Sequence, residues 1–266
     1  MTARTKYEHL EEILAGHGPM LVAFSGGVDS TLLATAAHEV LGGKTRCVLL
    51  DSPVVPRAAV AQAKAIAADL KLALDIIPVP LLERAEFCRN PKDRCYFCKK
   101  ISTVYLKKRA ADLGLSCIAD GINVSDTAEH RPGLRASTEE GIVHPFIEAG
   151  ITKQDIREIA REQGLPVWQK PSDACLGSRI PYGDEITPQK LHMIENAEVY
   201  LARLGIGQLR VRLHNNIARI EVHKEDMRSI LEQQSAVARH LKSLGFAYVT
   251  LDLDGYRSGS MDEVLR

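Results

Sequence analysis

The sequence has no apolar run long enough to cross a membrane, and its first residues lack the charged, apolar and small-residue order of a secretion signal. It also has no excess of charge, because 34 lysines and arginines balance 34 aspartates and glutamates. The missing basic excess argues against a nucleic-acid partner, although it does not exclude a local basic patch. We therefore expect a cytoplasmic protein with no membrane and no nucleic-acid partner.

Internal repeats and low-complexity tracts are also absent, and 266 residues suffice for one large domain and a smaller one. Over the first two thirds of the chain, strand-like apolar stretches alternate with helix-like stretches. This alternation predicts a parallel sheet that is covered on both faces. The expected strands are residues 20–24, 46–50, 74–78 and 116–119, and the expected helices are 6–16, 31–41, 57–70, 98–114 and 152–164.

The chain changes character after about residue 170, where residues 171–183 have the composition of an irregular linker. The expected elements that follow are a helix at 187–204, a hairpin of strands 208–213 and 217–223, a helix at 226–244 and a strand at 247–253. We therefore expect an α/β fold with two domains, residues 1–170 and residues 171–266, of which the second is a smaller α/β unit.

One short apolar stretch ends in Ser25-Gly-Gly-Val-Asp-Ser30, and an amphipathic helix follows. A strand, a glycine turn and a helix bring backbone N–H groups and the positive helix end to one point, which predicts an anion site. Gly26 and Gly27 let a phosphate approach the backbone, and Ser25 and Ser30 add hydroxyl donors. Asp29 would repel phosphate, so we expect it to bind Mg²⁺ or to brace the loop. A plain strand-to-helix turn with a serine cap is the alternative.

This loop differs from two other phosphate motifs, because neither Gly-Lys-Ser/Thr nor Gly-x-Gly-x-x-Gly is present in it. Two further polar segments follow expected strands, where parallel sheets place ligand contacts. They are Asp51-Ser52 and the loop Asp120-Gly-Ile-Asn-Val-Ser-Asp126, which leads to Arg131-Pro-Gly133. We expect the second loop to lie beside the anion site, within reach of adenine or of a second substrate; an ordinary surface loop is the alternative.

The six cysteines are expected to be thiols or metal ligands, because disulfides are rare in cytoplasmic proteins. Cys95 and Cys98 are three residues apart at the start of an expected helix and can share one metal or one redox bond. Cys175 stands alone in the linker, and neither His130 nor His144 follows a spacing that would complete a four-ligand zinc site. Three thiolates suit a [4Fe–4S] cluster with one open iron, and a chance pair of thiols is the alternative. The remaining cysteines, Cys47, Cys88 and Cys117, lie in or beside apolar segments and are expected to be structural.

Arg210 and Arg212 are two residues apart on an expected strand, so both side chains point to one face. Planar guanidinium groups suit bidentate contact with the carboxylate and phosphate of a mononucleotide. We expect Glu198, on the preceding helix, and Glu221, on the partner strand, to balance or orient these arginines. A solvated strand face is the alternative.

These motifs resemble known proteins at two levels. Ser25-Gly-Gly-Val-Asp-Ser30 after a strand resembles the pyrophosphate loop of the N-type ATP pyrophosphatases, which have an adenine nucleotide alpha hydrolase-like fold and cut ATP between the α and β phosphates. From about residue 7 to the end, the chain resembles the LarE family of ATP-dependent sulfur transferases, which help to build the nickel-pincer cofactor of lactate racemase. The matching segments are Ser25–Ser30, Asp93–Lys99, Asp120–Asp126, Arg131–Gly133, Cys175–Gly183 and Arg210–Arg212.

The resemblance implies a substrate, a set of cofactors and two sets of site residues. The substrate would be a pyridinium dicarboxylate mononucleotide, which is adenylated on a carboxylate and then thiolated with sulfur from a sulfide source. The cofactors would be ATP, Mg²⁺ and a [4Fe–4S] cluster, and we also expect a homo-oligomer. The nucleotide-binding set would be Ser25, Gly26, Gly27, Asp29, Ser30, Asp51, Ser52, Gly121 and Arg131. The catalytic set would be Cys175, Asp29, Asp126, Arg210, Arg212, Glu198 and Glu221.

The source of sulfur separates two kinds of family member. Some have only the cysteine that matches Cys175 and give up its sulfur, which leaves dehydroalanine. Others have three cysteines, which match Cys95, Cys98 and Cys175, and are thought to use a cluster. The presence of all three cysteines here favours the cluster, with sacrificial donation from Cys175 as the alternative.

Two functions of other classes remain as alternatives. A tRNA thiolase of the same superfamily also combines a pyrophosphate loop with three cysteines, but it usually carries zinc-binding cysteine pairs or a basic RNA-binding module, and neither is visible here. A non-catalytic nucleotide-binding regulator would not need thiols grouped in this way. Stimulation of pyrophosphate release by RNA or by the pyridine mononucleotide would distinguish these alternatives.

Overall fold

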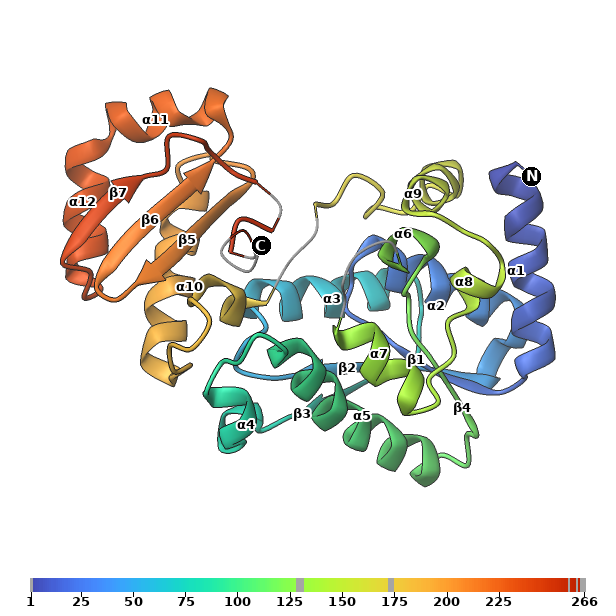
Figure 1. Cartoon of the computed structure of the whole chain (residues 1–266). Helices are drawn as coiled ribbons and strands as arrows, with labels where there is room; N and C mark the ends of the chain where they lie inside the picture. Colours follow the sequence, from blue (N-terminus) through green and yellow to red (C-terminus); the bar gives the residue numbers. More distant parts are fainter. Residues whose placement is uncertain (1, 128–131, 172–174, 258, 262, 264–266) are drawn as a thin grey trace. The chain divides into compact units, whose positions relative to one another are not determined.

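The computed structural model describes residues 2–127, 132–171, 175–257, 259–261 and 263 (Figure 1). It divides the chain into two compact units, of which the first is Met1–Leu81 with Asp93–Asp173 and the second is Leu82–Lys92 with Ala174–Arg266. Among the described residues, no helix has both the length and the apolar character needed to cross a membrane.

The first unit is built around a parallel sheet whose strands have the order β3-β2-β1-β4. Its strands are β1 (Met20–Ala23), β2 (Thr45–Asp51), β3 (Leu74–Pro78) and β4 (Cys117–Ala119). Its helices are α1 (Ala3–His17), α2 (Val28–Leu41), α3 (Arg57–Asp69), α5 (Arg94–Asp112), α6 (Val124–Thr127), α7 (Pro132–Glu139), α8 (Pro145–Glu148) and α9 (Lys153–Glu162). The four strands expected from the sequence are therefore confirmed.

Alternate residues of β1 enter two different apolar clusters. Met20 and Val22 pack with residues of α1, α2, α3, α8 and α9, whereas Leu21 packs with Leu106 and Ala110 of α5. Because successive side chains of a strand point to opposite faces, the sheet has helices on both faces. The expectation of an α/β fold with a doubly covered parallel sheet is confirmed.

The strand order places a switch of direction beside β1. The chain passes from β1 to β2 and β3 on one side, and it later returns to β4 on the other side. In open α/β sheets, the crevice at the carboxyl ends of the strands that flank such a switch is where ligands bind. The loops that follow β1 and β4 are therefore the expected walls of a site.

The first turns of α9 and α5 carry residues of the candidate sites. At the start of α9, the Thr152 hydroxyl accepts from the Asp155 N–H and the Asp155 carboxylate accepts from the Thr152 N–H, which forms a capping box. Helix α5 begins at Arg94, four residues before its expected start, so Cys95 and Cys98 both lie in its first turns.

The second unit contains a three-stranded sheet of order β5-β6-β7, in which β5 and β6 form an antiparallel hairpin and β7 runs parallel to β6. Its strands are β5 (Leu209–His214), β6 (Ile217–Val222) and β7 (Tyr248–Leu251), and its helices are α4 (Ala85–Cys88), α10 (Pro188–Ala202), α11 (Met227–Glu232) and α12 (Gln234–Ser243). Helix α10 contacts β5, and α12 contacts β7. The smaller α/β unit is therefore present.

The single helix expected at 226–244 is wrong, because the chain breaks at Gln233 into α11 and α12. The Gln233 side-chain amide donates to the Ser229 carbonyl oxygen, which a continuing helix would offer to the Gln233 N–H. That N–H bonds instead to the Ile230 carbonyl, three residues back.

One segment from the middle of residues 1–170 belongs to the second unit. The Asn90 side-chain amide, which is fully buried, donates to the carbonyl oxygens of Ile180 and Pro181 at 3.2 and 2.7 Å. The Gly183 N–H donates to the Asn90 carbonyl at 2.9 Å. Residues Leu82–Lys92 are thus tied to the stretch just after Cys175.

Candidate active site

The loop between β1 and α2 is braced by its own serines. The Ser30 hydroxyl accepts from the Ser25 N–H at 3.1 Å and lies 3.0 Å from the Ser25 hydroxyl. It also contacts the Gly27 carbonyl at 3.3 Å, and Gly27 is the N-cap of α2. The two serines that were expected to donate to a ligand therefore also brace the loop.

Gly26 is required by both its conformation and its surroundings. Its φ is +69°, in the region that favours glycine, and an added Cβ would lie 2.8 Å from the Cα of Ala63 on α3. Since that contact is with backbone, a side chain at this position could be accommodated only by moving α3 or the loop.

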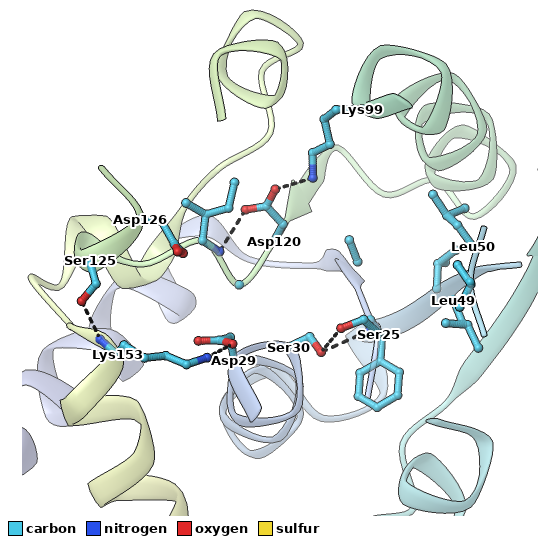
Figure 2. A pocket seen from close by; sticks show the side chains of 16 residues that line it. Ser25, Asp29, Ser30, Leu49, Leu50, Lys99, Asp120, Ser125, Asp126 and Lys153 are labelled. Atoms are coloured by element: carbon cyan, nitrogen blue, oxygen red, sulfur yellow. Dashed lines mark hydrogen bonds and ion pairs between the residues drawn. The ribbon is translucent and has the colours of Figure 1, made fainter. Parts of the chain in front are cut away.

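A cavity of about 580 Å³ opens beside this loop, at the carboxyl ends of β1, β2 and β4 (Figure 2). Its position matches the crevice expected at the direction switch of the sheet. It is lined by Ala23, Phe24, Ser25, Asp29, Ser30, Val48, Leu49, Leu50, Val55, Lys99, Asp120, Gly121, Ile122, Ser125, Asp126 and Lys153. Four of the apolar residues, Ala23, Val48, Leu49 and Leu50, lie on β1 and β2, and Asp29, Ser30 and Lys153 come from the first turns of helices.

Two carboxylates in the cavity are linked through one amide. The Asn123 side chain donates to Asp29 at 3.2 Å and to Asp126 at 2.9 Å. The Lys153 ammonium, from the first turn of α9, also pairs with Asp29 (Figure 2). Oxygen ligands from Asp29 and Asp126 are of the kind that Mg²⁺ prefers, so this part of the cavity fits that ion.

Gly121 brings the loop after β4 against the start of α2. An added Cβ would lie 3.0 Å from the backbone carbonyl carbon of Asp29 and 3.0 Å from the Ser30 nitrogen. The close approach of these two backbones keeps the loop after β4 next to the loop after β1, as expected from the sequence.

A buried carboxylate stands at the other wall of the cavity. Asp120 is 4% exposed and accepts a 2.7 Å hydrogen bond from the Lys99 ammonium (Figure 2). Burial alone would raise the pKa of Asp120, but the hydrogen bond with His144 and the charge of Lys99 hold it well below its usual range. Asp120 is therefore ionised, and Lys99 supplies a cation to the cavity.

Four of the expected nucleotide residues, Gly26, Gly27, Asp51 and Ser52, are not among the residues that line the cavity. Arg57 donates to the Asp51 carboxylate at 2.6 Å and to the Ser52 carbonyl at 2.8 Å, so these two residues hold the start of α3. From this stretch, Val48, Leu49, Leu50 and Val55 line the cavity. Arg131 lies outside the described residues.

In the second unit, Arg212 is enclosed by hydrogen-bond acceptors. Its guanidinium donates twice to Glu221, at 2.8 and 3.0 Å, once to the Ser178 carbonyl at 3.1 Å and once to the Ser260 hydroxyl at 3.1 Å. Glu221 is fully buried and also accepts from Arg219 at 2.9 Å. The expected pairing of Glu221 with an arginine of the β5 pair is present.

Glu198 has a different arginine as its partner. It accepts from Arg179 at 2.9 and 3.1 Å and from the Val211 N–H at 3.0 Å. Arg179, only 2% exposed, also donates to the Cys175 carbonyl at 2.9 Å. Glu198 therefore fixes the backbone at Cys175 through Arg179, a residue that we did not single out from the sequence.

Arg210 is the second arginine expected on this face. It is 7% exposed, and burial followed by the nearby charge of Arg179 lowers the pKa of its guanidinium. The ring of Tyr256 lies 5.5 Å from its guanidinium carbon. Three arginines of this unit, at positions 179, 210 and 212, are buried, and carboxylates pair with Arg179 and Arg212. Guanidinium groups suit an anionic substrate.

All six cysteines are among the described residues, and each is a thiol. Cys95 is exposed and Cys98 half-buried in the first unit, while Cys175 is half-buried in the second. Within the described part of the chain, no group of three or more His, Cys, Asp or Glu side chains is arranged to hold a metal ion. Two accessible thiols one turn apart on α5 remain chemically suited to ligate iron.

Five polar residues of the first site were not named as site residues from the sequence: Lys99, Asp120, Asn123, Ser125 and Lys153. Lys99 directly follows Cys98, and Asp120 and Asn123 stand in the polar loop, so the sequence motifs already indicated that these segments belong to a site. Lys153 stands at the first position of α9, directly after the Thr152 cap. The predicted start of this helix was the one feature of the sequence that pointed to its neighbourhood.

No family model matches the chain, but several known proteins resemble it over most of its length. It is 37% identical over 265 residues to the pyridinium-3,5-bisthiocarboxylic acid mononucleotide synthase of Lactiplantibacillus plantarum, covering 99% of this chain and 96% of that one. It is 39% identical over 263 residues to an uncharacterised protein of Synechocystis, covering 98% of both. It is 23% identical over 238 residues to one subunit of the glutamine-hydrolysing GMP synthase of Methanocaldococcus jannaschii, covering 85% and 71%. The GMP synthase relatives fit the ATP pyrophosphatase fold, in agreement with the parallel sheet and its loop.

Proposed function

The chain belongs to the LarE family of ATP-dependent sulfur transferases, and we propose that it converts a carboxylate of a pyridinium dicarboxylate mononucleotide to a thiocarboxylate. The observation that carries the proposal is the match, over nearly the whole chain, to a synthase whose name specifies the bisthiocarboxylic acid mononucleotide. The braced loop at the cavity in the first unit supports ATP as the activating co-substrate.

The first step we propose is adenylation. Ser25, Gly26, Gly27 and Ser30 would hold the β and γ phosphates, while Asp29 and Asp126 would ligate Mg²⁺. A substrate carboxylate oxygen attacks the α phosphorus, and the bond from that phosphorus to the leaving pyrophosphate breaks. The products of this step are an acyl-adenylate and pyrophosphate.

The second unit would hold the substrate. Positive charge from Arg210 and Arg212 suits the phosphate and carboxylate groups of a mononucleotide, and Glu221 fixes the plane of the Arg212 guanidinium through two hydrogen bonds. Glu198 acts on this site indirectly, because it holds Arg179, which in turn holds the Cys175 backbone.

The last step replaces the adenylate with sulfur. A sulfur nucleophile attacks the activated carbonyl carbon, and AMP leaves. We propose that Cys95, Cys98 and Cys175 hold a [4Fe–4S] cluster, which when bound would supply an open iron position for external sulfide. If Cys175 acted alone, its sulfur would attack and its Cβ–S bond would break once per chain, which would leave Cys95 and Cys98 without a role.

Anaerobic reconstitution with iron and sulfide tests this proposal. We expect AMP and pyrophosphate as products, more than one sulfur transferred per chain, and loss of both visible absorption and turnover in each variant Cys95→Ala, Cys98→Ala and Cys175→Ala. Full activity of the first two variants, with dehydroalanine at Cys175 in the wild type, would establish sacrificial donation. Pyrophosphate release that responds to RNA and not to the pyridine mononucleotide would favour the tRNA thiolase. The homo-oligomer stays a prediction, which sedimentation can check.

A further inference from the structure

The Asp120 carboxylate gathers hydrogen bonds from four parts of the first unit. One oxygen accepts from the Lys99 ammonium of α5 at 2.7 Å and from the Ser137 hydroxyl of α7 at 2.8 Å. The other accepts from the Ile122 N–H at 3.3 Å and lies 2.7 Å from Nδ1 of His144. An ionised carboxylate only accepts, so the His144 nitrogen donates. A group with this many donors is fixed in place.

Only part of this cluster faces the cavity. Asp120 and Lys99 line it, whereas Ser137 is fully buried and the His144 side chain is 11% exposed. His144 is itself held on its far side, where Nε2 lies 3.3 Å from the Thr138 hydroxyl. The arrangement is a cation at the cavity wall, an anion behind it, and two further side-chain donors that orient the anion.

We infer that Asp120 is a positioning residue that, oriented by His144 and Ser137, fixes the Lys99 ammonium for contact with the phosphates of the nucleotide. This inference rests on the proposed use of ATP. A lysine side chain has many rotamers, and holding its end in advance removes the entropy cost of ordering it when phosphate binds. An ammonium has three donors, and the geometry commits one of them to Asp120, which leaves donors for a phosphate.

Asp120 also acts on the loop that carries Gly121. Its bond to the Ile122 N–H sets the backbone two residues on, and a Cβ added at Gly121, between them, would lie 3.0 Å from backbone atoms of Asp29 and Ser30. The Asp120 carboxylate therefore fixes the position of the Lys99 ammonium and also the position of the backbone that packs on the phosphate loop. A purely structural role for Asp120 would act through the backbone alone, so the two roles can be separated by removing Lys99.

A double-mutant cycle on the full chain makes this separation. The variants are Asp120→Asn, Lys99→Met and their combination, and the measurement is the calorimetric Kd of α,β-methylene-ATP with Mg²⁺. Because a charge-assisted hydrogen bond is lost, we expect Asp120→Asn to weaken binding about tenfold when Lys99 is present and less than about twofold when Lys99 is Met. His144→Gln and Ser137→Ala should show the same dependence on Lys99 with smaller losses. Arg109→Gln, which breaks an ion pair with Asp75 farther along α5, is the control and should leave the Kd unchanged.

Equal losses with and without Lys99 would overturn the inference in favour of a structural role, as would an unchanged Kd in folded Asp120→Asn. Should Asp120→Asn fail to fold, His144→Gln and Ser137→Ala, which keep the carboxylate, decide the question in the same cycle. Binding of the analogue without thiolation of the pyridine mononucleotide would overturn the proposed function alone. Failure of the wild type to bind the analogue would overturn both.

Discussion

The Lys153 ammonium forms an ion pair with the Asp29 carboxylate, and both residues line the cavity beside the phosphate loop. Asp29 belongs to the first turn of α2, and Lys153 to the first turn of α9. When Mg²⁺ and a polyphosphate enter, the carboxylate can turn to the metal and the ammonium to a phosphate oxygen, so that every charge keeps a partner. We therefore expect Lys153 to take a direct part in nucleotide binding.

Lys153→Met should therefore weaken the binding of ATP. Loss of one charge-assisted hydrogen bond predicts a ten- to hundredfold rise in Kd, corresponding to about 1.5–3 kcal/mol. Calorimetric titration with α,β-methylene-ATP and Mg²⁺ measures it. Lys107→Met, which removes a lysine that pairs with Glu140, is the control. An affinity as high in Lys153→Met as in the control would remove Lys153 from the phosphate site.

Gly121→Ala should disturb the nucleotide site more than it disturbs folding. The new Cβ would meet backbone atoms of Asp29 and Ser30 at 3.0 Å, so the two loops must separate. We expect a loss of about 1–3 kcal/mol in the free energy of unfolding and weaker ATP binding. Gly43→Ala, where an added Cβ meets nothing within 4 Å, is the control. Denaturant unfolding and calorimetry give the two quantities, and wild-type values for both would show that the loops do not need this approach.

Arg212→Lys should reduce both stability and turnover. A lysine can replace the charge but not the four hydrogen bonds to Glu221, Ser178 and Ser260, and one oxygen of the buried Glu221 would lose the two guanidinium hydrogen bonds that it accepts. We expect about 2 kcal/mol less stability and a higher KM for the mononucleotide. Arg228→Lys, at an exposed pair with Glu232, is the comparison. Unchanged turnover together with an unchanged KM would place Arg212 outside the substrate site.

The cysteines should differ sharply in reactivity. Burial raises the pKa of Cys47 to about 12, and the residue is 1% exposed, whereas Cys95 is exposed. At pH 8, a thiol with this pKa is ionised to roughly one part in ten thousand, and the thiolate is the reactive form. In folded protein without metal, iodoacetamide should modify Cys95 and spare Cys47 until denaturant is added. Peptide mass spectrometry follows both sites, and equal labelling rates would contradict the buried position.

The decrease of the free energy of unfolding at acidic pH should depend on Asp120. Its pKa is lowered on folding, so the ionised carboxyl stabilises the folded protein at pH values above its ordinary pKa of about 3.9, and this contribution is lost as the pH falls further. The free energy of unfolding should therefore fall more steeply for wild type than for Asp120→Asn between about pH 4.5 and pH 2. Denaturant titrations at several pH values measure the two slopes. Parallel slopes would mean that Asp120 titrates alike in the folded and unfolded chains.

The parts of the site that are contiguous in sequence could be predicted, and those that depend on the fold could not. Ser25 to Ser30 form one loop, so a short motif with a strand before it and a helix after it was enough. Lys99, Asp120 and Lys153 come from α5, the end of β4 and α9, and they share a cavity only because the strand order places β4 next to β1.

The same limit holds in the second unit. The alternation of Arg210 and Arg212 indicated a shared face, but it did not indicate that Glu198 would pair with Arg179. That choice depends on how the short helical turn Leu176–Arg179 packs on α10 and β5. The break at Gln233 was missed because it depends on one side-chain amide competing for a backbone carbonyl.

The Leu82–Lys92 segment, with Asn90 bonded to Ile180 and Pro181, means that the chain passes from one unit to the other three times. A protease that cut once in the 170s would leave Leu82–Lys92 on the N-terminal fragment, so that the Asn90 amide would lose its bonds to Ile180 and Pro181 if the fragments separated. Neither unit can therefore be transferred to another protein by a single gene fusion.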